Sequence, residues 1–584
     1  MTEHVERDSM EVDVVIVGAG PSGLAAACRL MQQANEAEQE LTVCVVEKGS
    51  EVGAHILSGA VFEPRALDEL FPDWAERGAP LTTPAVRDEL YLLRDAEKAQ
   101  KLPNALVPKS MHNTGGDITR YVISAGNLCR WLAEQAEELG VEIFPGFAAQ
   151  EMIVDEDETV RGIIVGDMGV AADGTPKDSH MPGMELRAKY TLFAEGSRGH
   201  LGKRLIERFK LDEGKDPQHY GIGLKELWDV PAEQHEPGLV LHGSGWPLDK
   251  HTHGGWFLYH AENQQVVVGL IMDLAYQNPW LSPFDEFQRM KHHPVLKPYL
   301  EGGSRVAYGA RAITKGGINC LPKMTFPGGL LIGCDAGTLN FAKIKGLHTA
   351  MKSGMVAAET VFEALASGDE GGTELAAFTD KWQASWACKE LEESASFGPA
   401  IHKYGTVGGG AYNFLDQLVG GKLPRVHDTT PDHATLKPAA ECEKIEYPSP
   451  TASCPSTRPP RCFSPTPIMR KTSPAISSST IRTCRFATTC PNTPSRPSAI
   501  ARRASTRWSK ATTASRSSRS TSRTACTARP AISRTRPRTS PGWHRRVAAA
   551  PTIRTCDAPL LHKAPAEAGP CIVFILRDNG VPGA

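Results

Sequence analysis

The C-terminal part of this 584-residue sequence has almost no acidic residues. Residues 449–556 contain no Asp or Glu, whereas a globular stretch of that length would contain about a dozen. Residues 449–584 carry 23 Lys and Arg against 3 Asp and Glu, a net charge of +20, whereas residues 1–448 carry 41 against 64, a net charge of −23. The total of −3 therefore averages two different kinds of sequence, which must be interpreted separately.

Long hydrophobic runs and cysteine motifs are also absent. Apolar runs before residue 449, such as residues 14–17 and 330–332, have the length of strands and are too short to span a bilayer. Residues 1–10 are acidic and polar, so we expect neither a signal peptide nor a transit peptide, and we expect a bacterial cytoplasmic location. The 14 cysteines show no disulfide or metal-ligand spacing, and those before residue 449 are expected to be buried thiols.

Residues 11–47 contain the strongest local motif. A β-branched run at residues 12–17 is followed by Gly18-Ala19-Gly20-Pro21-Ser22-Gly23, a helical pattern, and a second strand that ends at Glu47 and Lys48. Gly18 permits a tight turn, Gly20 lets the backbone approach a pyrophosphate, and Gly23 lets helix and strand pack closely. The phosphate would lie at the helix N-terminus, and Glu47 would accept hydrogen bonds from ribose hydroxyls. This order of elements predicts a dinucleotide site; the alternative is a chance Gly-rich turn.

Two later segments favour FAD over NAD. A strand at residues 330–333 leads to Asp335, and Gly346 precedes a further helix. Flavoproteins with two dinucleotide-binding folds use such a segment to hold the ribityl hydroxyls; the alternative for Asp335 is a helix N-cap. Another strand leads to a turn with Glu195 and Gly196, also expected near the cofactor. No second G-x-G-x-x-G follows a strand, so we expect electrons from another protein or a bound substrate rather than from NAD(P)H.

Several segments are distinctive enough to indicate a family. They include Tyr220-Gly-Ile-Gly-Leu-Lys-Glu-Leu-Trp228, Gly254-Gly255-Trp-Phe-Leu-Tyr-His260, Tyr276-Gln-Asn-Pro279, Phe287-Gln-Arg-Met-Lys-His-His-Pro294 and Thr349-Ala-Met-Lys-Ser-Gly354. Together they closely resemble the electron-transfer flavoprotein–ubiquinone oxidoreductases, almost continuously from residue 12 to about residue 447. The resemblance implies that FAD takes electrons from reduced electron-transfer flavoprotein and passes them to ubiquinone, with a 4Fe-4S cluster as a relay and without a catalytic acid, base or nucleophile.

The resemblance also implies two contacts outside the FAD site. It places Gly254 and Gly255 beside the quinone, where glycine allows close backbone approach. It implies that residues 53–74 dip into one leaflet at the cytoplasmic face of the bacterial inner membrane, as in a peripheral, monotopic protein. Trp74 would lie at the headgroup boundary, and the apolar face would consist of Ile56, Leu57, Val61, Phe62, Leu67, Leu70 and Phe71. From the residues alone, the alternative is a buried core face.

The implied architecture is an α/β FAD-binding domain with an inserted α+β domain. The FAD-binding domain would comprise residues 11–220 and 305–385, after a disordered N-terminus at residues 1–10. The ubiquinone-binding domain would comprise residues 221–304, and residues 386–448 would form connecting helices and loops. Residues 449–584 would replace the ferredoxin-like 4Fe-4S domain with a disordered tail.

The genetic code explains this replacement. The family's cluster motif, Asn-Cys-Val-His-Cys-Lys-Thr-Cys, can be encoded as AAC TGC GTG CAC TGC AAG ACC TGC. Read one nucleotide later, these codons give Thr-Ala-Cys-Thr-Ala-Arg-Pro-Ala, which is the sequence of residues 524–531. The family's C-terminal sequence and stop codon convert in the same way into residues 543–557. We therefore interpret the tail as the product of a one-nucleotide frameshift near residues 448–449, in which no 4Fe-4S ligands are retained.

Three other interpretations fit parts of the sequence. A basic Ser/Arg-rich tail can bind nucleic acid, but this one lacks interleaved aromatic residues and any binding-module motif, so we expect no nucleic-acid partner. A geranylgeranyl-reductase-like FAD oxidoreductase would share the fold and the early glycine motif. The polypeptide as written could instead be an inactive FAD-binding product without its cluster domain.

Overall fold

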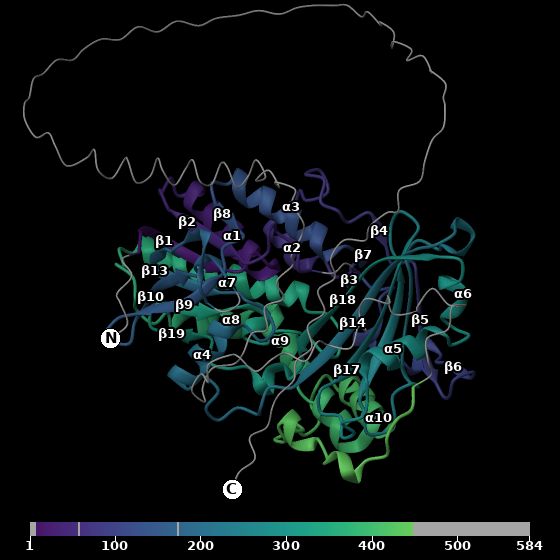
Figure 1. Ribbon diagram of the computed structural model, residues 1–584. Helices are drawn as coiled ribbons and strands as arrows, with labels where there is room; N and C mark the ends of the chain where they lie inside the picture. The colour runs from purple at the N-terminus through teal and green to yellow at the C-terminus, as the bar shows by residue number, and fades with distance from the viewer. Residues whose placement is uncertain (1–6, 57–58, 172–173, 448–584) are drawn as a thin grey trace, which may run out of the picture. The chain divides into compact units, whose positions relative to one another are not determined.

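The computed structural model describes residues 7–56, 59–171 and 174–447 (Figure 1). The expected disordered tail and Leu57 lie outside the described residues. At the N-terminus, strand β1 (Ser9–Val17) begins earlier than expected, and Arg7 forms an ion pair of 2.6 Å with Asp167. Residues 7–10 are therefore ordered, because the strand continues its pairing with β13 (Glu185–Phe193) as far as Ser9.

An eight-stranded sheet forms the core of the first half of the fold. Its central strands are parallel, in the order β20 (Gly329–Leu331), β13, β1, β2 (Val43–Glu47) and β8 (Glu142–Pro145). Three antiparallel strands complete it: β19 (Thr325–Phe326), β10 (Val160–Val165) and β9 (Ala149–Val154). The run of apolar residues in β1 is buried on both faces, as is typical of a central parallel strand.

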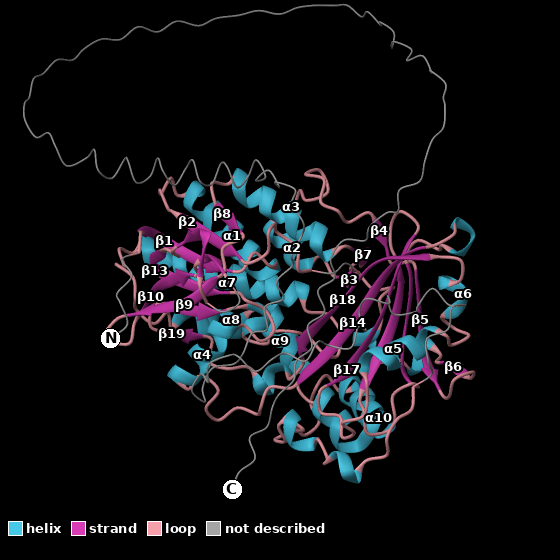
Figure 2. Cartoon of the chain, in the orientation of Figure 1, coloured by secondary structure: helices cyan, strands magenta, loops and turns pink. Residues whose placement is uncertain are grey.

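Helices pack around this sheet (Figure 2). They are α1 (Pro21–Glu36), α2 (Arg65–Leu70), α3 (Ala125–Glu138), α4 (His200–Phe209), α7 (Leu347–Ala366), α8 (Ala377–Ala384) and α9 (Trp386–Glu393). Helices α1 and α7 pack closely together, because a Cβ at Gly354 would overlap the carbonyl oxygen of Ser22. Helix α3 begins at Ser124, whose hydroxyl accepts the N–H of Asn127 at 3.2 Å.

A seven-stranded sheet forms the second half of the fold. Its order is β18 (Ser304–Thr314), β14 (Tyr220–Asp229), β17 (Gln265–Asp273), β16 (Gly254–His260), β15 (Leu239–Gly245), β5 (Arg87–Leu93) and β6 (Ala99–Lys101). All neighbouring strands are antiparallel except β15 and β5. Helices α5 (Pro283–Lys291) and α6 (Lys297–Leu300) accompany this sheet. Two of its strands therefore come from the segment expected to belong wholly to the FAD-binding domain.

Several smaller elements lie outside these two sheets. Strands β3 (Ala60–Phe62), β7 (Tyr121–Ile123) and β4 (Thr83–Pro84) form a three-stranded sheet, and β11 (Met168–Val170) pairs with β12 (Pro176–Met181). Helix α10 (Phe397–Leu418) is interrupted at Gly405, which has a φ of 73°. Short 3-10 helices are η1 (Asn104–Leu106), η2 (Lys109–Met111), η3 (Ala232–Gln234), η4 (Gly317–Cys320), η5 (Gly333–Asp335), η6 (Asp432–Thr435) and η7 (Ala439–Glu441).

Five of the seven side chains of the apolar face expected to enter a membrane lie inside the protein. Val61, Phe62, Leu67, Leu70 and Phe71 are all buried. Their elements explain this, because β3 pairs with β7 and α2 packs against α1 and α7. The structure therefore favours the alternative interpretation, a core face, for these five side chains.

Candidate cofactor and quinone sites

The glycine turn between β1 and α1 is fixed by close backbone packing. Gly18 has a φ of 109°, its N–H donates to the carbonyl oxygen of Val46 at 2.8 Å, and an added Cβ would lie 2.5 Å from the carbonyl oxygen of Ala194. A Cβ at Gly23 would overlap the carbonyl oxygen of Gly18. Both positions require glycine for reasons internal to the protein.

Gly20 differs from these two glycines. A Cβ added to it would meet no protein atom within 4 Å, and its φ of −84° is open to any residue. Gly20 is the N-cap of α1, and no side chain caps the first turn; Pro21 follows and Ser22 is buried. The open space beside Gly20 and the lack of a side-chain cap fit a phosphate bound at this helix N-terminus.

Glu47 lies beside this turn at the end of β2. Its Oε2 accepts the N–H of Ala19 at 3.1 Å and its Oε1 accepts the N–H of Gly49 at 2.7 Å. Each carboxylate oxygen can accept a further hydrogen bond, so the carboxylate is held in place and still has capacity for a hydroxyl donor. Lys48, the next residue, is exposed.

Glu195 and Asp335 lie side by side, and both carboxylates accept backbone hydrogen bonds. Glu195 Oε2 accepts the N–H groups of Leu201 and Gly202, each at 2.9 Å, so its carboxylate caps the start of α4. It also lies 3.2 Å from His200 Nδ1, and this hydrogen bond raises the pKa of His200. Asp335 Oδ2 accepts the N–H of Glu195 at 3.2 Å. Burial and the Glu195 carboxylate raise the pKa of Asp335 well above its usual value.

The predicted FAD residues converge at one edge of the parallel sheet. The glycine turn, Glu47, the Glu195–Gly196 turn and Asp335 follow the carboxyl ends of β1, β2, β13 and β20, where α/β sheets bind nucleotides. The Asp335 turn is tied to α7, because Ser353 Oγ accepts the N–H of Gly333 at 2.9 Å. Gly346 is the N-cap of α7, next to Leu339.

A cavity of about 150 Å³ lies between the α7 N-terminus and the seven-stranded sheet. Its lining is largely apolar and includes Phe62, Phe257 and Phe341, together with Gly346 from the predicted FAD site. Lys225 also lines it and donates from Nζ to the carbonyl oxygen of Gly59 at 2.9 Å. These lining residues come from segments far apart in the sequence.

Two lysines in the cavity wall have lowered pKa values. Burial lowers the pKa of Lys225 to about 8, and burial together with Arg120 lowers the pKa of Lys345 to about 7. Lys345 Nζ donates to Asn113 Oδ1 at 2.6 Å. In the sequence, only its position before Gly346 marks Lys345 as a candidate site residue. No local pattern indicates that Lys225 lines a cavity.

Gly254 and Gly255 begin β16 and are not among the residues that line this cavity. A Cβ at Gly254 would overlap the carbonyl oxygen of Ile271, and one at Gly255 would lie 2.8 Å from the carbonyl oxygen of Gly243. Close packing within the sheet thus explains both glycines, and their contact with a quinone stays a prediction.

The described cysteines do not fit an iron–sulfur cluster. Cys28, Cys44, Cys129, Cys320 and Cys388 are buried free thiols, and Cys334 and Cys442 are partly buried free thiols. Burial raises the pKa of Cys320 to about 12, which disfavours the thiolate that a cluster needs. Within residues 7–447, apart from the two short gaps, no cysteine belongs to a group able to hold a metal ion.

The fold and the edge site define a flavoprotein oxidoreductase of the dinucleotide-binding class. A family model for NAD(P)-binding Rossmann-like domains matches residues 16–78, and one for the ubiquinone-binding part of ETF-QO matches residues 220–313. The chain belongs to the electron transfer flavoprotein–ubiquinone oxidoreductase family, as its curated relatives show. The predicted fold class and family are therefore confirmed.

Two relatives and one solved structure illustrate the similarity. The Pseudomonas aeruginosa electron transfer flavoprotein-ubiquinone oxidoreductase is 67% identical over 449 residues, covering 76% of this chain and 81% of that protein. The human mitochondrial protein of that name is 48% identical over 456 residues, covering 76% and 73%. A geranylgeranyl bacteriochlorophyll reductase-like protein from Thermoplasma acidophilum has a TM-score of 0.52 and 18% identity, covering 71% and 92%. That likeness concerns the fold and does not favour the rival activity.

Proposed function

We propose that the product of this gene, when it is read in the family's frame throughout, takes electrons from reduced electron-transfer flavoprotein through bound FAD and delivers them to ubiquinone at a membrane surface. The 67% identity to the Pseudomonas aeruginosa protein carries this proposal. FAD supplies the redox chemistry when bound. The protein's task is to bind the cofactor, to orient it and to keep water away from it.

Specific residues support FAD binding at the sheet edge. The uncapped first turn of α1 offers N–H donors to a phosphate, and Gly20 leaves the approach open. Glu47 is held by two backbone N–H donors and can accept from a ribose hydroxyl. We assign Asp335 and Gly346 to the part of the cofactor that reaches toward the cavity, because Gly346 lines it.

Gly20→Ala tests the phosphate contact. The added methyl group meets no protein atom, so the variant should fold normally and lose most of its FAD, measured as flavin absorbance per polypeptide. Gly410→Ala adds a methyl group to equally open space in α10 and should keep its FAD. Full FAD occupancy in Gly20→Ala would remove the turn from the cofactor site.

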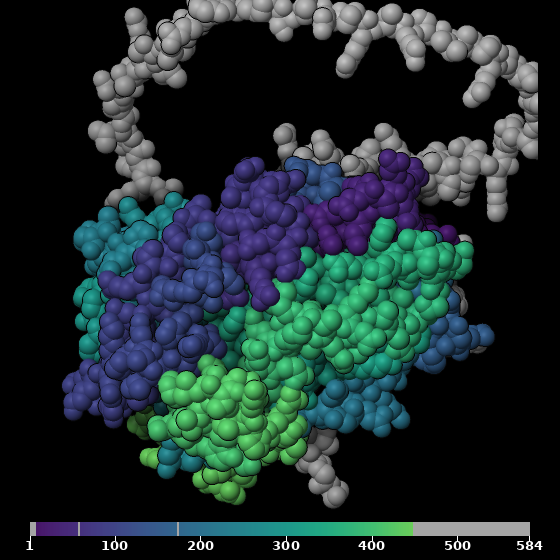
Figure 3. All heavy atoms as spheres, turned by 180° about the vertical axis from the view of Figure 1, so that it is seen from behind, coloured from purple at the N-terminus to yellow at the C-terminus, as the bar shows by residue number. Residues whose placement is uncertain are grey.

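The burial of five apolar side chains in residues 53–74 favours a membrane contact elsewhere on the protein. Exposed apolar side chains gather on the second half of α10, including Val407, Leu415 and Leu418, with exposed fractions of 81%, 55% and 63%. Figure 3 shows this part of the chain in light green at the molecular surface. Leu106 of η1 is 65% exposed, and Ser110 of the neighbouring η2 accepts a hydrogen bond from Gln417 of α10 at 2.6 Å. Within the described residues, no helix is both long enough and apolar enough to cross a bilayer.

We assign the lipid contact to this α10 surface, because large exposed apolar patches mark interaction sites. Replacing Leu415 and Leu418 together by Ser should reduce co-sedimentation with phospholipid vesicles. Val86→Ser alters an equally exposed residue outside α10 and should leave sedimentation unchanged. Equal loss in both variants, or no loss in either, would contradict the assignment.

We further propose that the tail is a frameshift product without cluster ligands. The alignment to the Pseudomonas aeruginosa protein spans 449 residues, close to the 448 that precede the change in composition. The sequence as written is expected to bind FAD without iron and without reducing quinone. A gene with the reading frame restored at codon 449 should yield bound iron and quinone reduction by electron-transfer flavoprotein. Stoichiometric cluster iron in the protein as written would refute the proposal that the tail is a frameshift product without cluster ligands. A protein with the restored frame that binds FAD and iron but does not reduce quinone would refute the proposed electron transfer to ubiquinone.

A further inference from the structure

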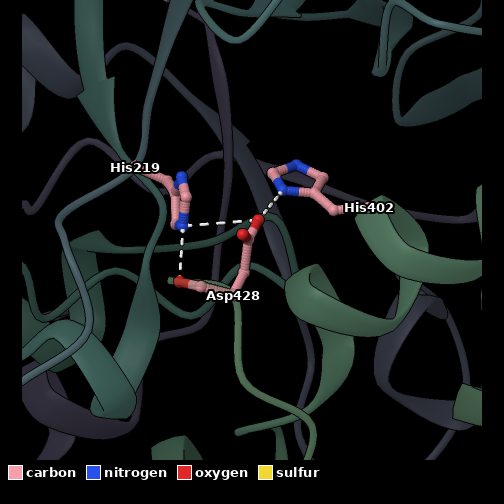
Figure 4. A group of neighbouring side chains, drawn as sticks. All are labelled: His219, His402 and Asp428. Carbon is pink, nitrogen blue, oxygen red and sulfur yellow. Dashed lines mark hydrogen bonds and ion pairs between the residues drawn. The ribbon is translucent and has the colours of Figure 1, made fainter. Parts of the chain in front are cut away.

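Two histidines and an aspartate converge from distant parts of the chain (Figure 4). His219 precedes β14, His402 lies on α10, and Asp428 lies in the segment that follows α10. Their ligand atoms all lie within 4.8 Å of one another. His402 Nδ1 is 2.6 Å from Asp428 Oδ2, and His219 Nε2 is 3.5 Å from the same oxygen.

The second nitrogen of each imidazole is held by another carboxylate. His219 Nδ1 is 2.8 Å from Asp432 Oδ1, and the other oxygen of Asp432 accepts the N–H of Tyr220 at 2.7 Å. His402 Nε2 is 2.8 Å from Asp273 Oδ2. Metal-binding histidines characteristically donate their second N–H to a carboxylate in this way, which fixes the ring and leaves the first nitrogen for the metal.

Charge balance separates this cluster from a second, similar one. Glu63, His348 and Glu390 also lie close together, but Lys343 and Arg120 form ion pairs with their two carboxylates and neutralise them. The first cluster has three carboxylates, from Asp273, Asp428 and Asp432. Their ammonium partner is Lys315, which forms an ion pair with Asp273 and lies 3.0 Å from His402 Nε2. When both imidazoles are neutral, these groups therefore have a net charge of −2.

We propose that His219 Nε2, His402 Nδ1 and the Asp428 carboxylate bind one divalent transition-metal ion, with Zn²⁺ as the best fit. Two imidazoles and one carboxylate are a common Zn²⁺ ligand set, with water as the fourth ligand. The ion supplies the two positive charges that the cluster needs. The ion would tie α10 and the segment after it to the start of β14.

Zinc titration of the full-length protein, stripped with a chelator, tests this site. Competition with a chromophoric chelator measures affinity, and Co²⁺ absorption reports the ligand type. The wild-type protein should bind one ion more than Asp428→Asn or His219→Gln, and this ion should show Co²⁺ bands without thiolate charge transfer. That criterion separates the site from the seven cysteines after residue 448. Asp432→Asn, which alters only the outer carboxylate, should weaken binding by about 10- to 100-fold.

His427→Gln is the matched control. His427 is exposed, pairs with Asp216 and lies next to Asp428 in the sequence. The substitution therefore removes an imidazole without altering any of the proposed ligands. It should bind zinc like the wild-type protein. Asp428→Asn preserves side-chain volume, so it reports on the site if His219→Gln fails to fold. Equal zinc binding by wild-type protein and Asp428→Asn, or a thiolate band on the extra ion, would overturn the proposal. The excess negative charge of the three carboxylates would then be neutralised by bound protons instead of a metal ion.

Discussion

Lys225 gives a prediction about stability against pH. Its side chain extends from β14 into the cavity, where Nζ contacts the Gly59 carbonyl and lies 5.6 Å from the Phe257 ring centre. Burial lowers its pKa from 10.5 to about 8, because the charged form loses water. Lys225→Met keeps a side chain of similar length and removes the charge. We therefore expect the variant to be more stable than the wild-type protein near neutral pH.

The magnitude follows from proton linkage. A folded-state pKa of about 8 against 10.5 in the unfolded chain corresponds to at most about 3.4 kcal/mol, since each pKa unit is worth about 1.4 kcal/mol. Between pH 8 and 10.5 the unfolded chain binds more protons, so wild-type stability rises with pH. Between pH 7 and 9.5 this group alone adds about 2 kcal/mol to the wild-type free energy of unfolding. Partial exposure to the cavity makes these values upper limits.

Urea unfolding at pH 7.0, 8.0 and 9.5, followed by circular dichroism, measures the effect. The advantage of Lys225→Met over wild type should be largest at pH 7.0 and shrink toward pH 9.5. Lys250→Met removes a charge from an exposed lysine and should show no such trend. Parallel pH profiles for wild type and Lys225→Met would refute a depressed pKa at this position.

Three further substitutions test the packing around the sites. Glu226→Gln should cost about 3–5 kcal/mol in urea unfolding, because it removes the buried carboxylate that pairs with Lys291 at 2.6 Å and with Arg305 at 3.3 Å; a loss below about 1 kcal/mol would contradict this. Ser124→Ala should cost about 1 kcal/mol by removing the cap of α3, and Ser124→Gly only a few tenths; equal losses would argue against the cap. Phe193→Ala should cost about 3–5 kcal/mol, since this side chain in β13 is fully buried. A small change in melting temperature would mean that neighbouring side chains move in to fill the space left by the ring.

The sequence alone predicts those features of the fold and the site that depend on residues close together in the chain. The motif from β1 to Glu47 is continuous in the chain, so its turn, helix and acid could be placed by spacing alone. The packing requirements at Gly18 and Gly23 agree with the roles expected of them. The parallel sheet could also be anticipated, because its strands are short apolar runs that alternate with helices.

Long-range pairing explains what the sequence did not reveal. Strand β5 joins the seven-stranded sheet through β15, about 150 residues away, and no local pattern encodes that register. The strand before Glu195 predicts a turn near the cofactor, but it does not reveal that the Glu195 carboxylate caps α4 a few residues later. The apolar face of residues 53–74 has the composition of a membrane surface and of a core alike. Its burial depends on α1, α7 and β7, which the pattern does not identify.

The last described residues bear directly on the proposed frameshift. Tyr447 donates from its hydroxyl to Glu286 Oε1 at 2.8 Å and accepts the N–H of Ser282 at 2.9 Å, which places it against the start of α5. Asn278 Nδ2 donates to the carbonyl oxygen of Glu443 at 2.9 Å. Because side-chain contacts across about 160 residues require a matched sequence on both sides, residue 447 still belongs to the family's reading frame. Acidic residues are absent from residues 449–556, so the two observations confine the proposed shift to the codons around residue 448.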